Sequence, residues 1–371
     1  MSKGHKTSFM PNYAIPPGET LRETLESIGM TQAELAERTG RPKKTINEII
    51  VGKAAITAET ALQLERVLGV PASFWNNLER NYRETLARLA EEKQLGMRLA
   101  WLKTFPVGAM IKAGWLPKEA APIQQLQALL TFFGVAGIEE WKRMWLSPQA
   151  AYRLSPAFQA NPSAVAAWIR RGEIEAADIG CKPYDSAGFR ESVKEARSLT
   201  ASTPDIFEPA LRKECAKAGV AVVFIPELPG THIFGATRWL NPAKALIQLS
   251  LRGKSDDLLW FTFFHEAAHI LLHGKRGVFI EDKGGGCGSS ETGDQEETEA
   301  NQFACNLLIP PQVFRSFVAR AQFDLDSTRS FAKRIGIAPG IVVGRLQHDR
   351  LIEFSQGNSL KQRFEFIEAK A

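Results

Sequence analysis

The first seventy residues alternate short amphipathic segments with breaks at glycine and proline. Thr31 to Glu34 forms a capping box, and Pro42 suits the first turn of a further helix. Glycines at 29, 40, 52 and 69 follow the last periodic residue of each segment, as helix ends require. The predicted helices cover residues 16–28, 31–39, 42–50 and 57–68. Short helices with a glycine turn between the second and the third are typical of a helix-turn-helix.

The third predicted helix carries the polar residues that would face DNA. Its isoleucines at 46, 49 and 50 should pack inward. From Arg38 to Lys53 the chain holds five basic residues against Glu48 alone, a local excess of four positive charges. The expected DNA-binding residues are Thr31, Gln32, Arg41, Lys43, Lys44, Thr45 and Asn47. The alternative is a small helical bundle with a solvated basic face.

Beyond residue 95 the hydrophobic pattern changes twice. Residues 95–158 are rich in Leu, Trp and Phe with Gly and Pro breaks, and further helices are expected at 164–170 and 186–199. Together they predict a helical linker domain at 96–199. The runs 220–225 and 245–251 are β-rich, with residues 235–240 between them, and predict a small sheet. Residues 274–294 should form a loop, and residues 331–351 a further helix pair with one more strand possible after it.

The helix expected after the sheet carries His265-Glu266-Ala267-Ala268-His269. Residues four apart share a helix face, so both imidazoles can bind one ion, while Glu266 can reach a water on that ion. A Zn²⁺ ion held by two imidazoles and one carboxylate keeps a fourth position open for water, which then becomes a nucleophile near neutral pH. The alternative is a buried helix whose histidines only satisfy backbone carbonyls.

The third ligand should come from the helix expected before Pro310-Pro311. Glu296 and Glu299 are close neighbours on that helix, and Glu299 borders the apolar stripe through Ala300 and Phe303. Glu296 and Glu297 suit a negative helix start instead. We therefore predict Glu299 as the ligand, with Glu296 as the alternative.

These two segments resemble one family closely. Residues 261–274, FTFFHEAAHILLHG, resemble the active helix of the ImmA/IrrE family of metallopeptidases, and EANQFA at 299–304 with LLIP at 307–310 resembles its third-ligand helix. The resemblance covers about residues 200–352. It implies His265, His269 and Glu299 as metal ligands and Glu266 as the catalytic base. Some members carry a ligand-sensing module after the protease core, and with the chain ending at Ala371 we expect none here.

The N-terminal segment resembles a second family. Residues 45–50, TINEII, with PASFW at 71–75 and Leu78-Glu79, resemble the helix-turn-helix of HigA-type antitoxins. The match covers about residues 12–90 and implies a homodimer that binds a double-stranded DNA operator with an inverted repeat.

The expected fold is therefore multidomain and mainly α. It comprises a five-helix helix-turn-helix domain at 12–95, the helical linker at 96–199, an α+β zincin-like metallopeptidase domain with a small sheet at 200–355, and a tail at 356–371. His273, one turn after His269, is expected beside the metal ligands. His348 resembles a family motif and is a candidate for stabilising the oxyanion.

Composition narrows the setting without naming the function. The chain of 371 residues is 44% hydrophobic with a net charge of +5, which is ordinary globular composition. Its 4 cysteines show no CxxC spacing, its start lacks an apolar signal region, and no apolar run is long enough to span a bilayer. We therefore expect a cytoplasmic protein that does not enter a membrane.

Three functions compete at this point. The first is a DNA-binding transcriptional regulator whose zinc (or manganese) endopeptidase domain cleaves a protein substrate such as a repressor or antitoxin. The second is a HigA-type antitoxin or repressor whose protease-like domain is a sensor or protein-binding module without turnover. The third is a zinc hydrolase of small amides. Glu266 favours the first over the second, because a binding scaffold needs no base there, and the helix-turn-helix disfavours the third.

Overall fold

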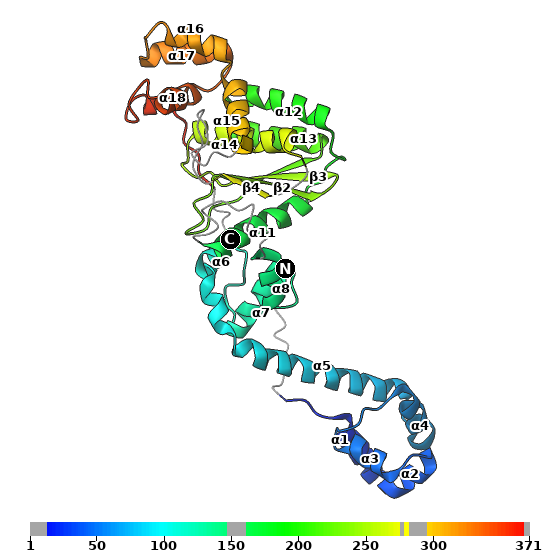
Figure 1. The fold of residues 1–371 in the computed structure, drawn as a ribbon. Coiled ribbons are helices and arrows are strands. Elements are labelled where there is room, and N and C mark those ends of the chain that lie inside the picture. The colour runs from blue at the N-terminus through cyan, green and yellow to red at the C-terminus, as the bar shows by residue number, and fades with distance from the viewer. Residues whose placement is uncertain (1–12, 147–160, 275–277, 282–294, 367–371) are drawn as a thin grey trace, which may run out of the picture. The chain divides into compact units, whose positions relative to one another are not determined.

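The computed structural model describes residues 13–146, 161–274, 278–281 and 295–366 (Figure 1). The chain divides between Ala100 and Trp101 into two compact units. Each unit is described by itself below.

The first unit is helical. Its helices are α1 Pro17–Ser27, α2 Gln32–Thr39, α3 Lys43–Ile50, α4 Ala58–Leu68 and α5 Ala72–Gly96. The Thr31 side chain accepts a hydrogen bond from Glu34 N at the start of α2, and Gly40 ends α2 in the left-handed conformation with φ 67°. One buried cluster joins all five helices and includes Leu21 and Trp75. The five-helix domain predicted from the sequence is confirmed.

The second unit surrounds a four-stranded sheet. Its helices are α6 Val107–Lys112, α7 Pro122–Phe133, α8 Ile138–Trp145, α11 Pro162–Ala177, α12 Ser186–Leu199, α13 Pro204–Lys217, α14 Asp256–Leu272, α15 Gln295–Leu308, α16 Pro311–Val318, α17 Leu325–Ile335 and α18 Pro339–His348, with 3-10 helices at Leu99–Thr104 and Asn358–Leu360. The strands are β1 Val220–Phe224, β2 Gly235–Asn241, β3 Lys244–Leu249 and β4 Val278–Glu281. Their order is β1-β3-β2-β4, with β1 parallel to β3 and the other pairs antiparallel.

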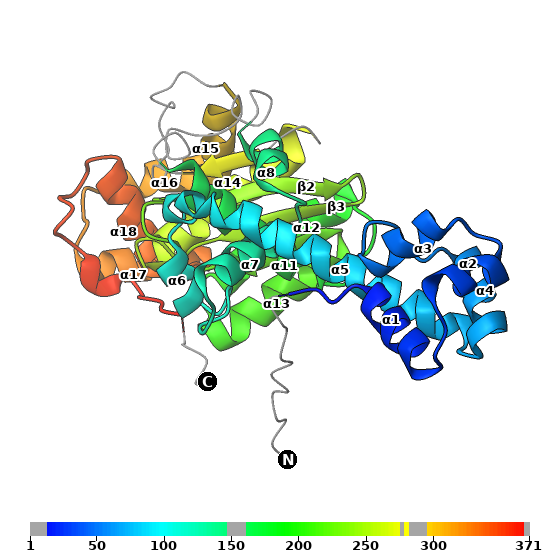
Figure 2. The same cartoon turned by 90° about the horizontal axis from the view of Figure 1, so that it is seen from below.

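Each face of the sheet is covered by different helices. Because side chains alternate along a strand, Val220 and Val222 belong to one buried cluster, together with residues of α12 to α15, while Ala221 and Val223 belong to another. The second cluster contains residues of α6, α7, α8 and α11. Figure 2, seen from below, shows α7 and α11 in front of the strands. Both faces are therefore shielded from water.

This packing revises the expected linker. Trp168 of α11 donates from Nε1 to Ile225 O at 3.1 Å, and Gln248 of β3 donates from Nε2 to Trp168 O at 2.7 Å. The predicted boundary between residues 199 and 200 has no counterpart in this packing, because helices before that boundary share a core with the sheet after it.

Other details differ from the sequence-based expectations as well. Strand β4 lies within the segment expected to be a loop, where most of the remaining residues fall outside the described part. Gly336 ends α17 with φ 71°, but Gly340 lies inside α18. The possible last strand is a single bridge between Ser255 and Arg363. The predicted fold class, mainly helical with a small sheet, is confirmed. Among the described helices, none combines the length and apolarity that a bilayer span requires.

Candidate functional site

The HExxH sequence lies on α14, a helix buried along nearly its whole length. His265 and His269 are each 1% exposed and lie on one face, with their Nε2 atoms 3.0 Å apart. Phe279 of β4 stacks on His269 with ring centroids 4.1 Å apart. Two buried ring nitrogens thus point to one place, as the four-residue spacing predicts.

A carboxylate of α15 completes the cluster, and it belongs to Glu297. Its Oε2 lies 3.2 Å from His265 Nε2 and its Oε1 lies 3.5 Å from His269 Nε2. Among the described residues, His265, His269 and Glu297 form the group of three side chains suited to hold a metal ion. Glu299, which the sequence analysis favoured, is not in this group, and neither is Glu296.

The difference comes from the rotational phase of α15. The sequence pattern predicts a buried stripe through Ala300 and Phe303, whereas the buried positions include Ala300, Asn301 and Ala304. Glu297 lies three and four residues before Ala300 and Asn301 and therefore shares their face. Glu299, two residues on, turns away from it.

The ring nitrogens that face away from the cluster also have partners. His265 Nδ1 lies 3.0 Å from Asn301 Oδ1, which accepts a hydrogen bond from the ring and leaves Nε2 as the ligand atom. His269 Nδ1 lies 2.8 Å from His273 Nδ1, and His273 Nε2 lies 3.3 Å from Glu299 Oε2. His273 is thus placed beside the candidate ligands as expected, and Glu299 contacts His273 rather than the ion site.

Glu266 is fully buried next to this cluster. Neither of its carboxylate oxygens has a hydrogen-bond partner among the described residues. Burial raises the pKa of Glu266 to about 8, against a lowering effect of His265. A Cβ atom at Gly235 of β2 would lie 2.5 Å from Thr262 Cγ2 and 3.1 Å from Glu266 Oε1, so only glycine leaves room for this carboxylate.

Three carboxyl groups surround the His265 ring in this cluster. Burial disfavours the charged form of His265, yet the carboxylates of Glu297, Glu281 and Glu266 raise its pKa to about 9. Burial and the adjacent His265 hold the pKa of His269 well below its usual value. Glu281, at the end of β4 with Oε2 3.2 Å from His265 Nε2, was not found from the sequence. A run of charged residues around it gives no signal that one of them is buried.

The donor atoms fit a metal ion of the zinc type. The two Nε2 atoms lie 3.0 Å apart, and each has a Glu297 oxygen within 3.5 Å, Oε2 for His265 and Oε1 for His269. A tetrahedral site with bonds of about 2.0–2.1 Å has edges of roughly 3.3 Å. Two imidazoles, one carboxylate and a nearby carboxylate without a partner form a donor set that suits a catalytic Zn²⁺ site with an open position.

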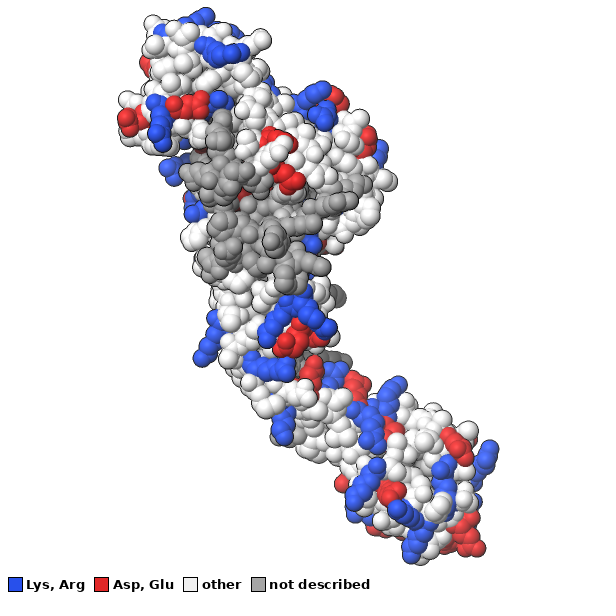
Figure 3. All heavy atoms as spheres, in the orientation of Figure 1, with Lys and Arg blue, Asp and Glu red and all other residues white. Residues whose placement is uncertain are grey.

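The residues proposed to read DNA lie at the N-terminal end of α3. Lys43, Lys44 and Asn47 are exposed, and Thr45 is partly buried. Lys44 makes only a loose pair with Glu48, at 3.8 Å. On the face that Figure 3 shows, basic and acidic side chains are interspersed over the first unit, so the positive charge of α3 is a local feature.

The remaining proposed DNA residues have structural roles or lie nearby. Thr31 caps α2, and Gln32 is partly exposed in its first turn. Arg41 donates from Nε to Gln63 Oε1 at 2.5 Å and lies 3.5 Å from Glu59 Oε1, so its side chain ties α4 to the turn before α3.

His348 lies away from the histidine pair. Its Nδ1 is 3.1 Å from Asp349 Oδ1, and the residue lines a separate pocket at α18. No contact joins it to the candidate metal ligands among the described residues.

Two family models match this chain. Residues 21–75 match the helix-turn-helix model, and residues 215–347 match the model of the IrrE N-terminal-like domain. The first match contains α2 and α3. The second contains α14 and α15, and with them every residue of the histidine and glutamate cluster.

Two curated proteins are similar to less than a fifth of this chain. Over 70 residues the chain is 41% identical to "Virulence-associated protein I" of Dichelobacter nodosus, covering 19% of this chain and 65% of that protein. Over 63 residues it is 32% identical to "Uncharacterized HTH-type transcriptional regulator YddM" of Escherichia coli, covering 17% of this chain and 67% of that protein. These matches span about two thirds of each relative.

Solved structures also match less than a quarter of this chain. A HigA-family addiction module antidote protein from Coxiella burnetii is 33% identical, covering 23% of this chain and 92% of its own, with a TM-score of 0.22. The Pseudomonas aeruginosa antitoxin HigA, solved with the higBA promoter, is 35% identical, covering 22% of this chain and 90% of its own, with a TM-score of 0.21.

Proposed function

We propose that this chain is a DNA-binding transcriptional regulator with a zinc-dependent endopeptidase domain. The proposal is supported by the helix-turn-helix match at residues 21–75 and by the IrrE N-terminal-like match at residues 215–347. Its substrate would be a protein such as a repressor or antitoxin. It would act in the cytoplasm as a homodimer on an operator with an inverted repeat.

One observation carries the peptidase half of this proposal. The buried Glu266 carboxylate has no hydrogen-bond partner among the described residues and lies beside a cluster of His265, His269 and Glu297. A purely structural or binding module gains nothing from burying an acid without a partner, since burial of such a group is costly. A hydrolase needs a base at this place.

The residues of the site can perform peptide hydrolysis in named roles. His265, His269 and Glu297 would hold the ion, and Asn301 would fix the ring of His265 through its Nδ1 atom. A bound Zn²⁺ ion supplies Lewis acidity toward the scissile carbonyl and lowers the pKa of a coordinated water; Mn²⁺ is the alternative.

Glu266 would move the proton. Its carboxylate would accept a proton from the attacking water and deliver it to the nitrogen of the leaving amine. Burial of Glu266 favours the protonated carboxyl that is needed between the two steps, while a bound dication would lower its pKa toward the range that a base needs. Strand β4 lies at the edge of the sheet beside His269, where an extended peptide could pair with it.

The substitution Glu266→Gln tests the peptidase directly. Because Glu266 is not a proposed ligand, the variant should keep its metal and its DNA binding, lose cleavage, and retain its substrate. A protein that is pulled down with the variant is then incubated with wild type, which should cleave it. Glu191→Gln, an exposed change on α12, serves as the matched control. If Glu266→Gln regulates its target genes as wild type does, regulation does not depend on cleavage. A repressor with a sensor domain then becomes the better account.

The DNA half rests on the exposed basic start of α3 in a helix-turn-helix. Lys43, Lys44 and Asn47 would enter the major groove, and the side chains of Thr31 and Gln32 would contact phosphates. Loss of one base contact typically costs about 1–3 kcal/mol of binding free energy. If a Lys43→Ala/Lys44→Ala variant binds the chain's own promoter as tightly as wild type at moderate salt, this groove assignment is wrong. The exposed Lys93→Ala of α5 is the control.

A further inference from the structure

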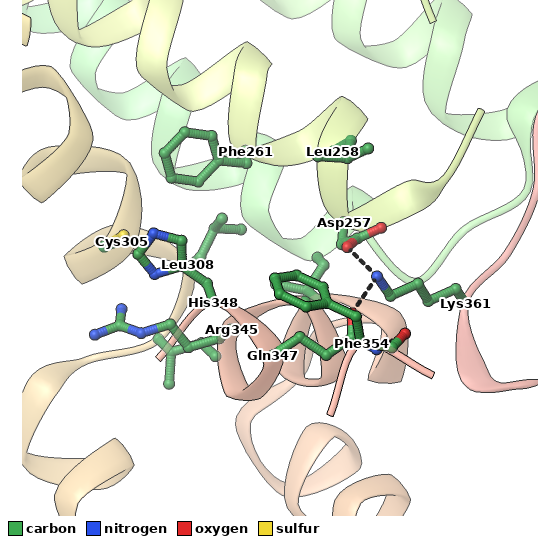
Figure 4. Close-up of a pocket in the computed structure, with 13 residues that line it drawn as sticks. Asp257, Leu258, Phe261, Cys305, Leu308, Arg345, Gln347, His348, Phe354 and Lys361 are labelled. Atoms are coloured by element: carbon green, nitrogen blue, oxygen red, sulfur yellow. Dashed lines mark hydrogen bonds and ion pairs between the residues drawn. The ribbon is translucent and has the colours of Figure 1, made fainter. Parts of the chain in front are cut away.

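A pocket of about 310 Å³ lies between α14, α15 and α18 (Figure 4). Its walls are mostly apolar and include Phe261, Leu308, Ile341 and Phe354. This volume is at the lower end of the range found for small-molecule sites, and an apolar cavity with a few polar groups is their usual form. The pocket takes no part in the mechanism proposed above.

One end of the pocket presents cationic and donor groups that are already oriented. Asp349 accepts from Arg345 Nε at 2.7 Å and pairs with His348 Nδ1 at 3.1 Å. The Arg345 guanidinium also lies over the ring of Phe314, 4.7 Å from its centroid. Among the described residues, the two terminal nitrogens of Arg345 and the Nε2 atom of His348 have no partner. The guanidinium is therefore fixed in place by one carboxylate, and its terminal nitrogens remain available as donors.

The other end of the pocket is already neutralised. Lys361 Nζ lies 2.7 Å from Asp257 Oδ2 and donates to Gln347 Oε1 at 2.8 Å, as the dashed lines in Figure 4 show. Asp257 is 91% buried in this pair, counting its side chain alone. An anion is therefore attracted to the Arg345 end of the cavity rather than to Lys361.

We propose that this pocket binds a small carboxylic acid with an apolar body. The carboxylate would accept from the terminal nitrogens of Arg345, which form a fork that matches a carboxylate. The hydrocarbon part would lie against Phe261, Ile341 and Phe354. Since the same chemistry is offered by the free end of a peptide, the experiment below separates that source from a free acid.

The site stands close to the candidate metal centre along two helices. Phe261 is one turn before His265 on α14, and Cys305 is one turn after Asn301 on α15. Asn301 holds the ring of His265. A bound acid would therefore contact both helices that carry the proposed ligands, although the binding itself does not depend on catalysis.

Calorimetric titration of the full chain tests the proposal with octanoate as the probe. Wild type should bind one octanoate per chain, bind neutral octanamide at least tenfold more weakly, and show no binding of acetate, which lacks the apolar body. Arg345→Gln should weaken octanoate at least tenfold while leaving octanamide unchanged. Ile341→Trp should fill the cavity and abolish binding of both. The matched control is Arg334→Gln, since Arg334 also stacks on a phenylalanine but lines no part of this pocket.

Circular dichroism must show that each variant folds as wild type does. Equal binding of octanoate and octanamide, or octanoate binding that survives Ile341→Trp, would overturn the proposal. A final arm uses an N-acetylated Leu-Leu-Leu peptide with a free carboxyl end. If that peptide binds at least tenfold more tightly than octanoate and its amidated form does not, the pocket serves a peptide end and the assignment to a free acid is refuted.

Discussion

The start of α14 carries a buried acid whose ionisation should oppose folding. Asp256 is 0% exposed, and its Oδ2 atom has no hydrogen-bond partner among the described residues. Burial, together with the adjacent Asp257, raises the pKa of Asp256 from 3.8 to about 7. A Cβ atom at Gly340 would lie 2.2 Å from Asp256 Oδ1, so α18 leaves no room for the side chain to move toward water.

The sign of the effect follows from which state holds the proton. Between about pH 4 and pH 7 the folded chain keeps the Asp256 proton and the unfolded chain does not, so the free energy of unfolding falls as pH rises through this window. A shift from 3.8 to about 7 amounts to roughly 4 kcal/mol in full, of which roughly 2.5 kcal/mol is lost between pH 5 and pH 8. Above the folded pKa there is no further loss from this group.

Asp256→Asn removes the ionisation and keeps the Oδ1 acceptor for Asp257 N, a hydrogen bond of 3.0 Å. The stability of the variant relative to wild type should therefore increase by about 2.5 kcal/mol from pH 5 to pH 8. Urea denaturation followed by tryptophan fluorescence measures this difference, in which the other titrating groups cancel. The exposed Asp326→Asn is the control and should track wild type. If the Asp256→Asn and wild-type curves stay parallel across this pH range, Asp256 is ionised in the folded protein and the argument fails.

Three further predictions concern the candidate metal ligands, the space around Glu266 and the hydrogen bonds of Arg197. Elemental analysis should find no zinc in Glu297→Gln. Glu299→Gln should keep zinc with affinity reduced about tenfold, because Glu299 contacts His273 rather than the ion site. The reverse result would make Glu299 the ligand, as first predicted. Gly235→Ala should lower the cleavage rate roughly 10²-fold with metal content unchanged, because its Cβ atom would meet Thr262 Cγ2 at 2.5 Å and displace Glu266. The double variant with Thr262→Ser should recover part of the rate, and no recovery would count against this contact. Arg197→Met should lower the free energy of unfolding by about 3 kcal/mol, because the guanidinium donates to carbonyls at the ends of α15 and α17, and an unchanged urea midpoint would contradict that role.

Local patterns in the sequence were sufficient for what depends on one helix at a time. The four-residue spacing of His265 and His269 placed both rings on one face, and glycine and capping residues located α2 and α3. The structure places Glu297 rather than Glu299 beside the histidines. Acids two residues apart differ only by the phase of α15, and that phase is set by contact with α14. Asn301 and Glu281 escaped notice for the same reason, since their roles depend on partners far away in the chain.

The boundary expected between residues 199 and 200 has no counterpart in the packing for a related reason. Residues 96–199 look helical by composition, and they are. Composition does not predict that α11 packs on β1 and β3, which lie more than forty residues later in the chain. The short strand β4 was missed because its four residues give too little alternation to stand out within a glycine-rich segment.

The sheet covered on both faces has a practical consequence for anyone dissecting this protein. A polypeptide beginning at residue 200, or at the start of the matched peptidase region, would carry every proposed metal ligand and the base. It would also leave Ala221, Val223 and Leu246 bare to water where α7, α8 and α11 had been. A contiguous apolar surface of this kind promotes aggregation. The smallest piece expected to remain dispersed therefore begins near Trp101, so the region with the candidate metal ligands is expected to fold alone only together with the helices that precede it.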